Sequence, residues 1–215
     1  MDELDEKEKE TVILLHGLWM KGLEMALLKK RLQDAGFVAC VYSYPTVSKT
    51  LTENVEALAR FIKDNTCGTV SLVGHSYGGI VACGLVNRIL AGTNKGIRVK
   101  RCIFLGSPLL GSTIARRWER WAFFRFITGK SLEPLKAGCH LSGGNQVESL
   151  MVAGTMNLGF GMFMIKGPGD GVVALSETMA PWLHAHKTVH VTHMGLLFSR
   201  RVARLCIDFL HSGLS

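Results

Sequence analysis

Ser76 lies between two glycines, Gly74 and Gly78, in the segment LVGHSYGGIV (72–81). An apolar, strand-like run ends just before the serine, and a helix-like run begins just after it. A sharp turn from strand to helix needs small residues two positions on either side of its apex, because strand and helix approach closely there. Glycine-rich chains also contain this pattern by chance, but the flanking strand and helix favour a turn that presents the Ser76 hydroxyl as a nucleophile.

His193 is the candidate general base. A serine hydroxyl needs such a base to attack a carbonyl group at neutral pH, and the base needs an acid to orient it. The segment TVHVTHMGLLFS (188–199) places His193 between a predicted strand and an apolar helix. We therefore expect its imidazole at the sheet edge that carries Ser76, whereas His190, inside the predicted strand, points to the opposite face. The alternative for His193 is a hydrogen-bonded structural role.

Asp170 is the candidate acid. It lies in the glycine-rich segment IKGPGDGVVALSE (165–177) and is the only acidic residue between Glu148 and Glu177. Glycines there fit a tight turn whose backbone can satisfy a carboxylate. The alternative is an ordinary turn aspartate, which is common in such sequences.

The attack of a serine on a carbonyl group also needs hydrogen-bond donors for the oxygen that becomes negative. The backbone N–H of Tyr77, directly after the serine, is one candidate. Leu18, in the segment LLHGLWMKG (14–22) after the first strand, supplies the other. We expect the side chain of His16 to brace this loop. The alternative is a simple strand-to-helix turn without a catalytic role.

Short β-branched runs alternate with amphipathic runs along the chain. Because the strands are apolar throughout and separated by helices, they predict an α/β fold with a mostly parallel central sheet flanked by helices, and all strand carboxyl ends at one edge. Thr52 is a candidate cap for the second helix. The predicted strands are 11–15, 37–44, 69–74, 99–105, 149–154 and 189–192, and the predicted helices are 22–33, 52–65, 78–90 and 196–210. In the first helix, Leu23, Ala26 and Leu27 are expected on the apolar face.

Length and composition predict one domain over residues 1–215, preceded by an acidic tail at residues 1–10. The start is acidic and polar rather than basic and apolar, and no apolar run is long enough to span a membrane. We therefore expect a soluble, cytoplasmic protein. In such a protein the six cysteines, which form no CxxC pair, are expected to be free thiols.

The formal net charge is +8. A basic surface attracts nucleic acid, anionic lipid or acidic substrates. No nucleic-acid-binding motif accompanies the charge, so we expect no nucleic-acid partner. The sequence also contains no cluster with the spacing of metal ligands, and we expect neither a metal nor an organic cofactor.

Residues 111–147 interrupt the alternation of strands and helices, and aromatic residues are interleaved with arginines there. One interpretation is a cap over the site, in which the aromatic side chains line an acyl pocket and the arginines of the 111–136 segment contact an anionic membrane. Two others are aromatic core packing with arginine stems along it, and a solvated face without function. The candidate pocket residues are Trp118, Trp121, Phe123 and Phe124.

From about residue 11 to 210, the chain resembles α/β-hydrolases of the serine lipase and esterase group. The segments HGLWM, GHSYGG, LGSPLLGS, GPGDGVV and HMGLLFSRRVA are similar to that group's landmarks, in their usual order. Related pieces occur in small bacterial lipase-like hydrolases and in deacylases of the GPI-inositol type. The resemblance implies that Ser76 is the nucleophile, Asp170 the acid and His193 the base.

The sequence therefore predicts a serine hydrolase that cleaves carboxylic esters, acyl or lipid-like, through an acyl-enzyme. The same triad cleaves thioesters and lipid-linked amides, so a thioesterase or a deacylase is the nearest alternative. A non-catalytic, membrane-associated scaffold is an alternative of a different class.

Overall fold

The computed structural model describes residues 11–141, 146–158, 165 and 167–213. Six strands form one sheet in the order β2-β1-β3-β4-β5-β6, and every neighbouring pair is parallel. The α/β architecture predicted from the sequence is confirmed. The strands are β1 (Thr11–Leu15), β2 (Val38–Tyr42), β3 (Thr69–His75), β4 (Arg98–Leu105), β5 (Glu148–Gly154) and β6 (Ala185–Val189).

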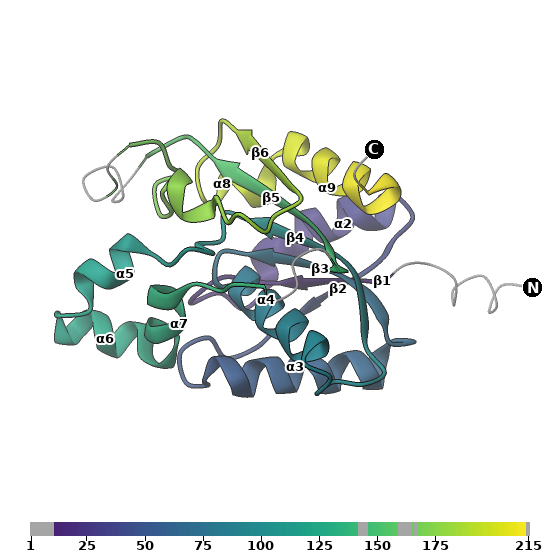
Figure 1. Ribbon diagram of the computed structural model, residues 1–215. Coiled ribbons are helices and arrows are strands. Elements are labelled where there is room, and N and C mark those ends of the chain that lie inside the picture. The colour runs from purple at the N-terminus through teal and green to yellow at the C-terminus, as the bar shows by residue number, and fades with distance from the viewer. Residues whose placement is uncertain (1–10, 142–145, 159–164, 166, 214–215) are drawn as a thin grey trace, which may run out of the picture.

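Helices cover both faces of the sheet (Figure 1). One face carries α3 (Leu51–Asn65) and α4 (Tyr77–Leu90). The other carries α2 (Ala26–Asp34), α8 (Gly195–Phe198) and α9 (Arg200–Ser212). Alternate side chains of β1 enter the two cores: Ile13 and Leu15 pack towards α3 and α4, while Val12 and Leu14 pack towards α2 and α9. Burial on both faces explains why β1 is apolar at every position from Val12 to Leu15.

Residues 111–141 form a group of short helices beside the sheet, at the left of Figure 1. They are α5 (Thr113–Trp118), α6 (Ala122–Thr128), the 3₁₀ helix η2 (Gly129–Ser131) and α7 (Leu132–Ala137). Leu132 and Leu135 join the core on the α4 side of the sheet. The predicted tail at residues 1–10, and residues 142–145 of the interruption, lie outside the described residues. Within the described part of the chain, no helix has the length and apolar character needed to cross a bilayer.

Several predicted boundaries are wrong. The last strand runs from Ala185 to Val189 instead of 189–192, so His190 follows the strand instead of lying inside it. Thr50, not Thr52, caps α3, in a capping box with Glu53. The predicted final helix is broken into α8 and α9, because the Ser199 side chain accepts a hydrogen bond from the N–H of Val202 and starts a new helix.

The apolar face predicted for the first helix is also wrong. Leu23 and Leu27 are exposed, whereas Met25, Leu28 and Leu32 are buried. The 3₁₀ helix η1 (Leu23–Met25) follows Gly22, which has a φ of 97°, and only then does α2 begin. This extra turn changes the rotational phase of the helix, so a single α-helical period through residues 22–33 selects the wrong side chains.

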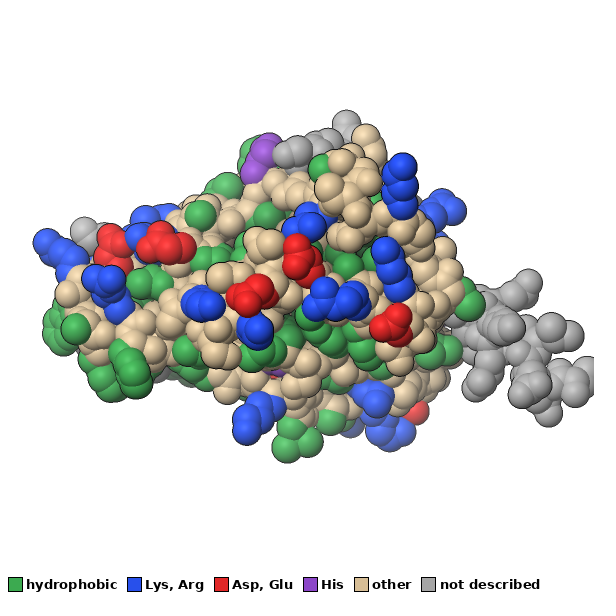
Figure 2. Space-filling model, turned by 90° about the horizontal axis from the view of Figure 1, so that it is seen from below, with side chains coloured by type: hydrophobic (Ala, Val, Ile, Leu, Met, Phe, Trp, Pro, Cys, Tyr) green, Lys and Arg blue, Asp and Glu red, His purple; other side chains and the backbone are tan. Residues whose placement is uncertain are grey.

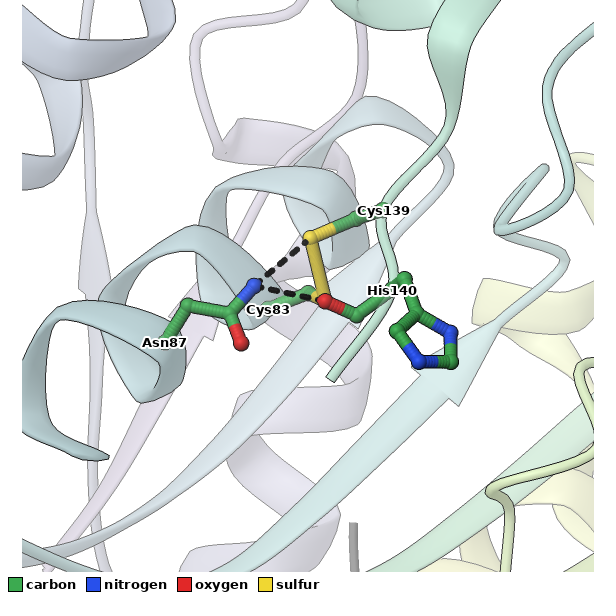
Figure 3. Close-up of a disulfide and its surroundings, with 4 residues drawn as sticks. All are labelled: Cys83, Asn87, Cys139 and His140. Atoms are coloured by element: carbon green, nitrogen blue, oxygen red, sulfur yellow. Dashed lines mark hydrogen bonds between the residues drawn. A yellow bond between two sulfur atoms is a disulfide. The ribbon is translucent and has the colours of Figure 1, made fainter. Parts of the chain in front are cut away.

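The six cysteines are not all free thiols. Cys83, in α4, forms a disulfide with Cys139, just after α7, although 56 positions separate them in the chain. The Asn87 side-chain amide donates hydrogen bonds to the Cys139 sulfur and to the His140 carbonyl (Figure 3). The disulfide therefore ties the end of the inserted helices to the helix that follows Ser76. The remaining four, Cys40, Cys67, Cys102 and Cys206, are free, as predicted.

Candidate active site

Ser76 occupies the turn between β3 and α4 with φ 54° and ψ −121°, a conformation that residues with a side chain rarely adopt. Its N–H donates to the Leu105 carbonyl of β4 at 2.9 Å. A Cβ atom at position 78 would overlap the Leu15 carbonyl, and one at position 74 would lie 2.5 Å from the Gly79 nitrogen. The two glycines therefore permit the close approach that holds Ser76 in its strained turn.

Asp170 and His193 contact each other twice. The Asp170 Oδ2 atom lies 2.7 Å from His193 Nδ1, and the Asp170 carbonyl accepts the His193 backbone N–H, also at 2.7 Å. The other carboxylate oxygen, Oδ1, accepts the N–H groups of Val172 and Val173. Both side chains are buried. This arrangement fixes the orientation of the imidazole and directs its Nε2 atom away from the carboxylate.

Two glycines show how closely the strand ends converge. A Cβ atom at Gly106, after β4, would lie 2.9 Å from Asp170 Oδ2 and 3.2 Å from His193 Nδ1. A Cβ atom at Gly17, after β1, would lie 3.2 Å from the Ser76 Cβ. The structure therefore brings Ser76, Asp170 and His193 to one edge of the sheet, as the sequence predicts.

The loop after β1 carries Leu18 and is braced by His16. The His16 Nδ1–H donates to the Gly17 carbonyl at 3.0 Å, which leaves Nε2 to accept the Tyr44 N–H at 3.2 Å. The Tyr44 hydroxyl donates to the His16 carbonyl, and the two rings stack with centroids 4.4 Å apart. Burial lowers the pKa of His16, which keeps the ring neutral in this role. The bracing role predicted for His16 is therefore what the geometry shows.

Trp19 holds the same loop from its outer side. It is the other described non-glycine residue with positive φ, 61°. Its N–H donates to Thr46 Oγ1 at 3.1 Å, and its indole N–H donates to the Ile127 carbonyl in α6 at 2.7 Å. Ser76 and Trp19, in two neighbouring loops, are therefore both held in a strained backbone conformation. The sequence analysis did not single out Trp19, because nothing in its residue type signals a left-handed conformation.

The two candidate oxyanion donors come from two segments, Leu18 from the loop after β1 and Tyr77 from the start of α4. Tyr77 is the first residue of α4, so no carbonyl one turn earlier in that helix is available to its N–H. Its ring is buried, and burial raises the pKa of its hydroxyl. Leu18 is half-buried and packs against the core on the α4 side.

His75, directly before the nucleophile, is a residue that the sequence analysis missed. It is fully buried, and its ring packs on the His193 ring with centroids 4.7 Å apart. Its Nε2–H donates to the His193 carbonyl at 3.2 Å. Burial lowers the pKa of His75 well below the ordinary value, with a smaller effect from the neighbouring His193. A neutral His75 therefore supports the backbone of the residue proposed as base.

Asp170 and Glu177 are the two buried carboxylates among the described residues. Glu177 accepts the N–H of Thr113, where α5 begins, and the N–H of Ala174. It thus joins the inserted helices to the segment after Asp170, a role with no signal in the sequence. Within the described part of the chain, no three His, Cys, Asp or Glu side chains are grouped as metal ligands.

The four candidate pocket residues are divided between the interior and the surface. Phe124 is buried and packs edge-to-face on Trp118, with centroids 5.2 Å apart. Trp121 and Phe123 are exposed. All four line a hollow of about 490 Å³ together with Arg117 and Arg120, and none of the three candidate triad residues lines it. A role in substrate binding stays a prediction.

The parallel sheet, with the turn after its third strand, has the architecture of the α/β-hydrolase fold. The lipase BlEst2 of Bacillus licheniformis has a similar structure, with TM-score 0.68 and 23% identity over 94% of this chain and 91% of that one. The phospholipase PlaB of Legionella pneumophila is also similar, with TM-score 0.71 and 15% identity over 95% of this chain and 60% of that one. A carboxylesterase of Nitrososphaera gargenis has TM-score 0.66 and 14% identity, over 95% of this chain and 91% of that one.

At the level of sequence, residues 5–155 match a family described as a domain of unknown function, DUF7379. The chain belongs to this family. Asp170 and His193 lie beyond the matched residues. A comparison with curated protein sequences finds no match.

Proposed function

We propose that the protein is a serine hydrolase that cleaves carboxylic esters through an acyl-enzyme. Ser76 is the nucleophile, His193 the general base and Asp170 the acid that orients it. The observation that carries the proposal is the Asp170–His193 hydrogen bond of 2.7 Å at the sheet edge where Ser76 occupies its strained turn. The solved structures of similar fold bear the names of lipases, a phospholipase and carboxylesterases, which supports ester hydrolysis in general terms.

In the proposed mechanism, His193 Nε2 takes the hydroxyl proton of Ser76 as its oxygen attacks the ester carbonyl. The backbone N–H groups of Leu18 and Tyr77 stabilise the negative oxygen that forms. The imidazolium then gives its proton to the departing alkoxide. A water molecule, deprotonated by His193, cleaves the serine ester and releases the acid. Asp170 keeps the proton on Nδ1, so that Nε2 is free to act as base.

We also infer that residues 1–215 form a single catalytic domain in which residues 111–147 act as a cap beside the site. The support comes from the hydrogen bond between Trp19 and Ile127 and from the contacts of Glu177, which join this segment to loops around the triad. Where the protein works stays a prediction. The disulfide between Cys83 and Cys139 weighs against the expected cytoplasmic location, because disulfides persist mainly in oxidising compartments.

An acyl ester, small or lipid-like, is the substrate class we favour, without a metal or an organic cofactor. Thioesters and lipid-linked amides are the alternatives, because the triad acts on an acyl carbon whatever its leaving group. A non-catalytic scaffold is disfavoured by the ordered Asp170–His193 pair, since a scaffold has no need of it.

The test is hydrolysis of p-nitrophenyl esters over a series of acyl-chain lengths, with thioester and amide analogues in parallel. We expect ester hydrolysis to fall by about 10⁴-fold or more in Ser76→Ala. The matched control, Ser212→Ala, removes an exposed hydroxyl at the end of α9 and should retain full activity. Equal activity in wild type and Ser76→Ala would contradict the proposal, and faster thioester than ester turnover would favour the first alternative.

A further inference from the structure

The outer side of α5 and α6 carries large aromatic side chains in solvent. Trp121, Phe123 and Phe126 are 70%, 72% and 82% exposed. Exposed side chains of this size lying close together on a soluble domain mark an interaction site. Arg117, Arg120 and Arg125 are interleaved with them and are also exposed. We call these six residues the α6 surface. Hydrophobic side chains lie beside Lys and Arg side chains at the left end of Figure 2.

The three arginines of the α6 surface make no ion pair in the described part of the chain. Other cations nearby are paired: Lys136 contacts Glu119 and Glu133, and Lys130 contacts Glu53. Residues 113–136 contain six basic and two acidic residues, a net charge of +4. The unpaired guanidinium groups are therefore available to a negatively charged partner.

Two hollows flank α6. One, of about 490 Å³, has Arg117 and Arg120 beside Trp121 and Phe123. The other, of about 820 Å³, has Arg120 and Arg125 beside Phe126. Glu119 and Glu133 also line it, and both are paired with Lys136. Each hollow thus combines cations with an apolar wall. This pairing suits a phospholipid, whose phosphate is negative and whose acyl chains begin a few ångströms deeper.

The α6 surface is held firmly at the catalytic edge. The Trp19 indole donates to the Ile127 carbonyl, and the Lys130 N–H donates to the Val47 carbonyl at 2.9 Å. Trp19 is adjacent to Leu18, the proposed oxyanion donor. A flat partner that contacts the α6 surface therefore comes to lie beside the site.

We propose that the α6 surface docks the protein on a bilayer that contains anionic phospholipid. Arg117, Arg120 and Arg125 contact the lipid phosphates, while the three aromatic side chains enter the boundary between headgroups and acyl chains. Duplex nucleic acid fits less well, because its contacts are made mainly to phosphate and sugar and leave the exposed aromatic side chains without an apolar layer to enter. The docking itself rests on exposure and charge alone. That docking brings lipid esters to Ser76 rests on the proposed function.

The test is co-sedimentation of Ser76→Ala protein with vesicles of phosphatidylcholine alone, or with about one third phosphatidylglycerol. This protein lacks the nucleophile, so binding is measured without hydrolysis. We expect binding to the anionic vesicles only, weakened by added salt. Replacing Arg117, Arg120 and Arg125 with Gln should weaken it by about fivefold per arginine, or roughly a hundredfold together. Replacing Trp121 and Phe126 with Ala should weaken binding without abolishing its preference for anionic lipid.

A matched control replaces Lys63, Lys95 and Arg98, exposed cations near the opposite edge of the sheet, with Gln. This variant has the same net charge as the arginine variant and should bind like the parent. Equal loss in both variants would overturn the proposal, as would equal binding to neutral and anionic vesicles. Duplex DNA that displaces the protein from vesicles at equal charge would assign the surface to nucleic acid instead. If vesicle binding fails while ester hydrolysis survives in the wild type, the docking alone is refuted.

Discussion

The catalytic edge and the α6 surface are neighbours that are built in opposite ways. At the edge, the backbone segments meet so closely that a Cβ atom at Gly74 or Gly78 would overlap backbone atoms, and Asp170 and His193 are buried and hydrogen-bonded to each other. On the α6 surface, aromatic and charged side chains extend into solvent. Under the proposed function and the proposed docking, the closely packed edge is where the reaction occurs and the exposed surface is where the membrane binds. Substitutions at the edge should therefore damage catalysis or folding, whereas substitutions on the α6 surface should affect neither.

Asp170→Asn should have the largest effect on rate. The asparagine oxygen can still accept the N–H groups of Val172 and Val173, but its NH₂ group faces His193 Nδ1 and favours the wrong tautomer. We expect kcat to fall by about 10⁴-fold with little change in KM. The control is Asp208→Asn, an exposed carboxylate of α9, which should leave kcat unchanged. A fall of less than tenfold would contradict the role of Asp170.

Gly78→Ala should have the largest effect on folding. Its methyl group would overlap the backbone oxygens of Leu15 and His16, and backbone atoms cannot move aside as a flexible side chain does. We expect a loss of about 4 kcal/mol or more in the free energy of unfolding, measured with urea. In Gly84→Ala, in the same helix, the new methyl group meets only side-chain atoms, the nearest a Val55 methyl at 3.0 Å. This variant should change the free energy of unfolding by less than about 1 kcal/mol. Similar losses in both would refute the close-approach argument.

The inserted helices have a buried side, which carries Phe124, and an exposed side, which carries Phe126. Phe124 is buried against Trp118, so Phe124→Ala should cost about 3 kcal/mol of unfolding free energy. Phe126→Ala, on the exposed side, should change it by less than about 0.5 kcal/mol. Thermal or urea unfolding of the two variants provides the measurement. A costly Phe126→Ala would show that the α6 surface is part of the core.

The smallest effect concerns pH. Burial holds the pKa of His75 well below its ordinary value of 6.5, so the folded protein keeps this ring neutral while the unfolded chain takes up a proton. The free energy of unfolding should therefore fall as pH drops below about 6.5. His16 and His186, whose pKa values burial also lowers, act in the same direction. Glu53, whose pKa is lowered to about 2, loses its contribution only below its ordinary value of 4.5.

His75→Asn tests this account, because an amide can still donate to the His193 carbonyl but does not titrate. Between about pH 7 and pH 5, the free energy of unfolding measured with urea should depend less steeply on pH, by about 1 kcal/mol per pH unit on average. Gly84→Ala serves as the control, because it can change the free energy of unfolding but not the dependence of that free energy on pH. An unchanged slope in His75→Asn would show that another group carries the pH dependence.

The sequence was sufficient for the central strands and for the convergence of Ser76, Asp170 and His193. The strands were predicted from apolar runs, and Ser76 and His193 from their positions soon after such runs. Asp170 was predicted because it is the only acidic residue between Glu148 and Glu177. The prediction failed at β6. This strand lies at the edge of the sheet, pairs with one neighbour and has the sequence AHKTV, which is too polar to stand out as an apolar run. The disulfide could not be foreseen, since Cys83 and Cys139 meet only once the inserted helices return to α4. His75 gave no signal because its contact with His193 exists only in the folded chain.

The sequence also could not predict which sides of α5 and α6 are buried and which are exposed. α5 and α6 have six and seven residues, too few for a periodic pattern to separate an inner side from an outer one. Aromatic residues occur on both sides, so Phe124 and Phe126 look alike until the packing is known.

The most direct test of the central claim is the site of covalent labelling by a fluorophosphonate. The probe forms a stable bond with a serine oxygen only where a base removes the hydroxyl proton and donors hold the phosphonyl oxygen. We predict one label per chain, located on Ser76 by peptide mass spectrometry, lost in Ser76→Ala and strongly slowed in His193→Ala. A label that persists in Ser76→Ala, or that maps to another residue, would contradict the account.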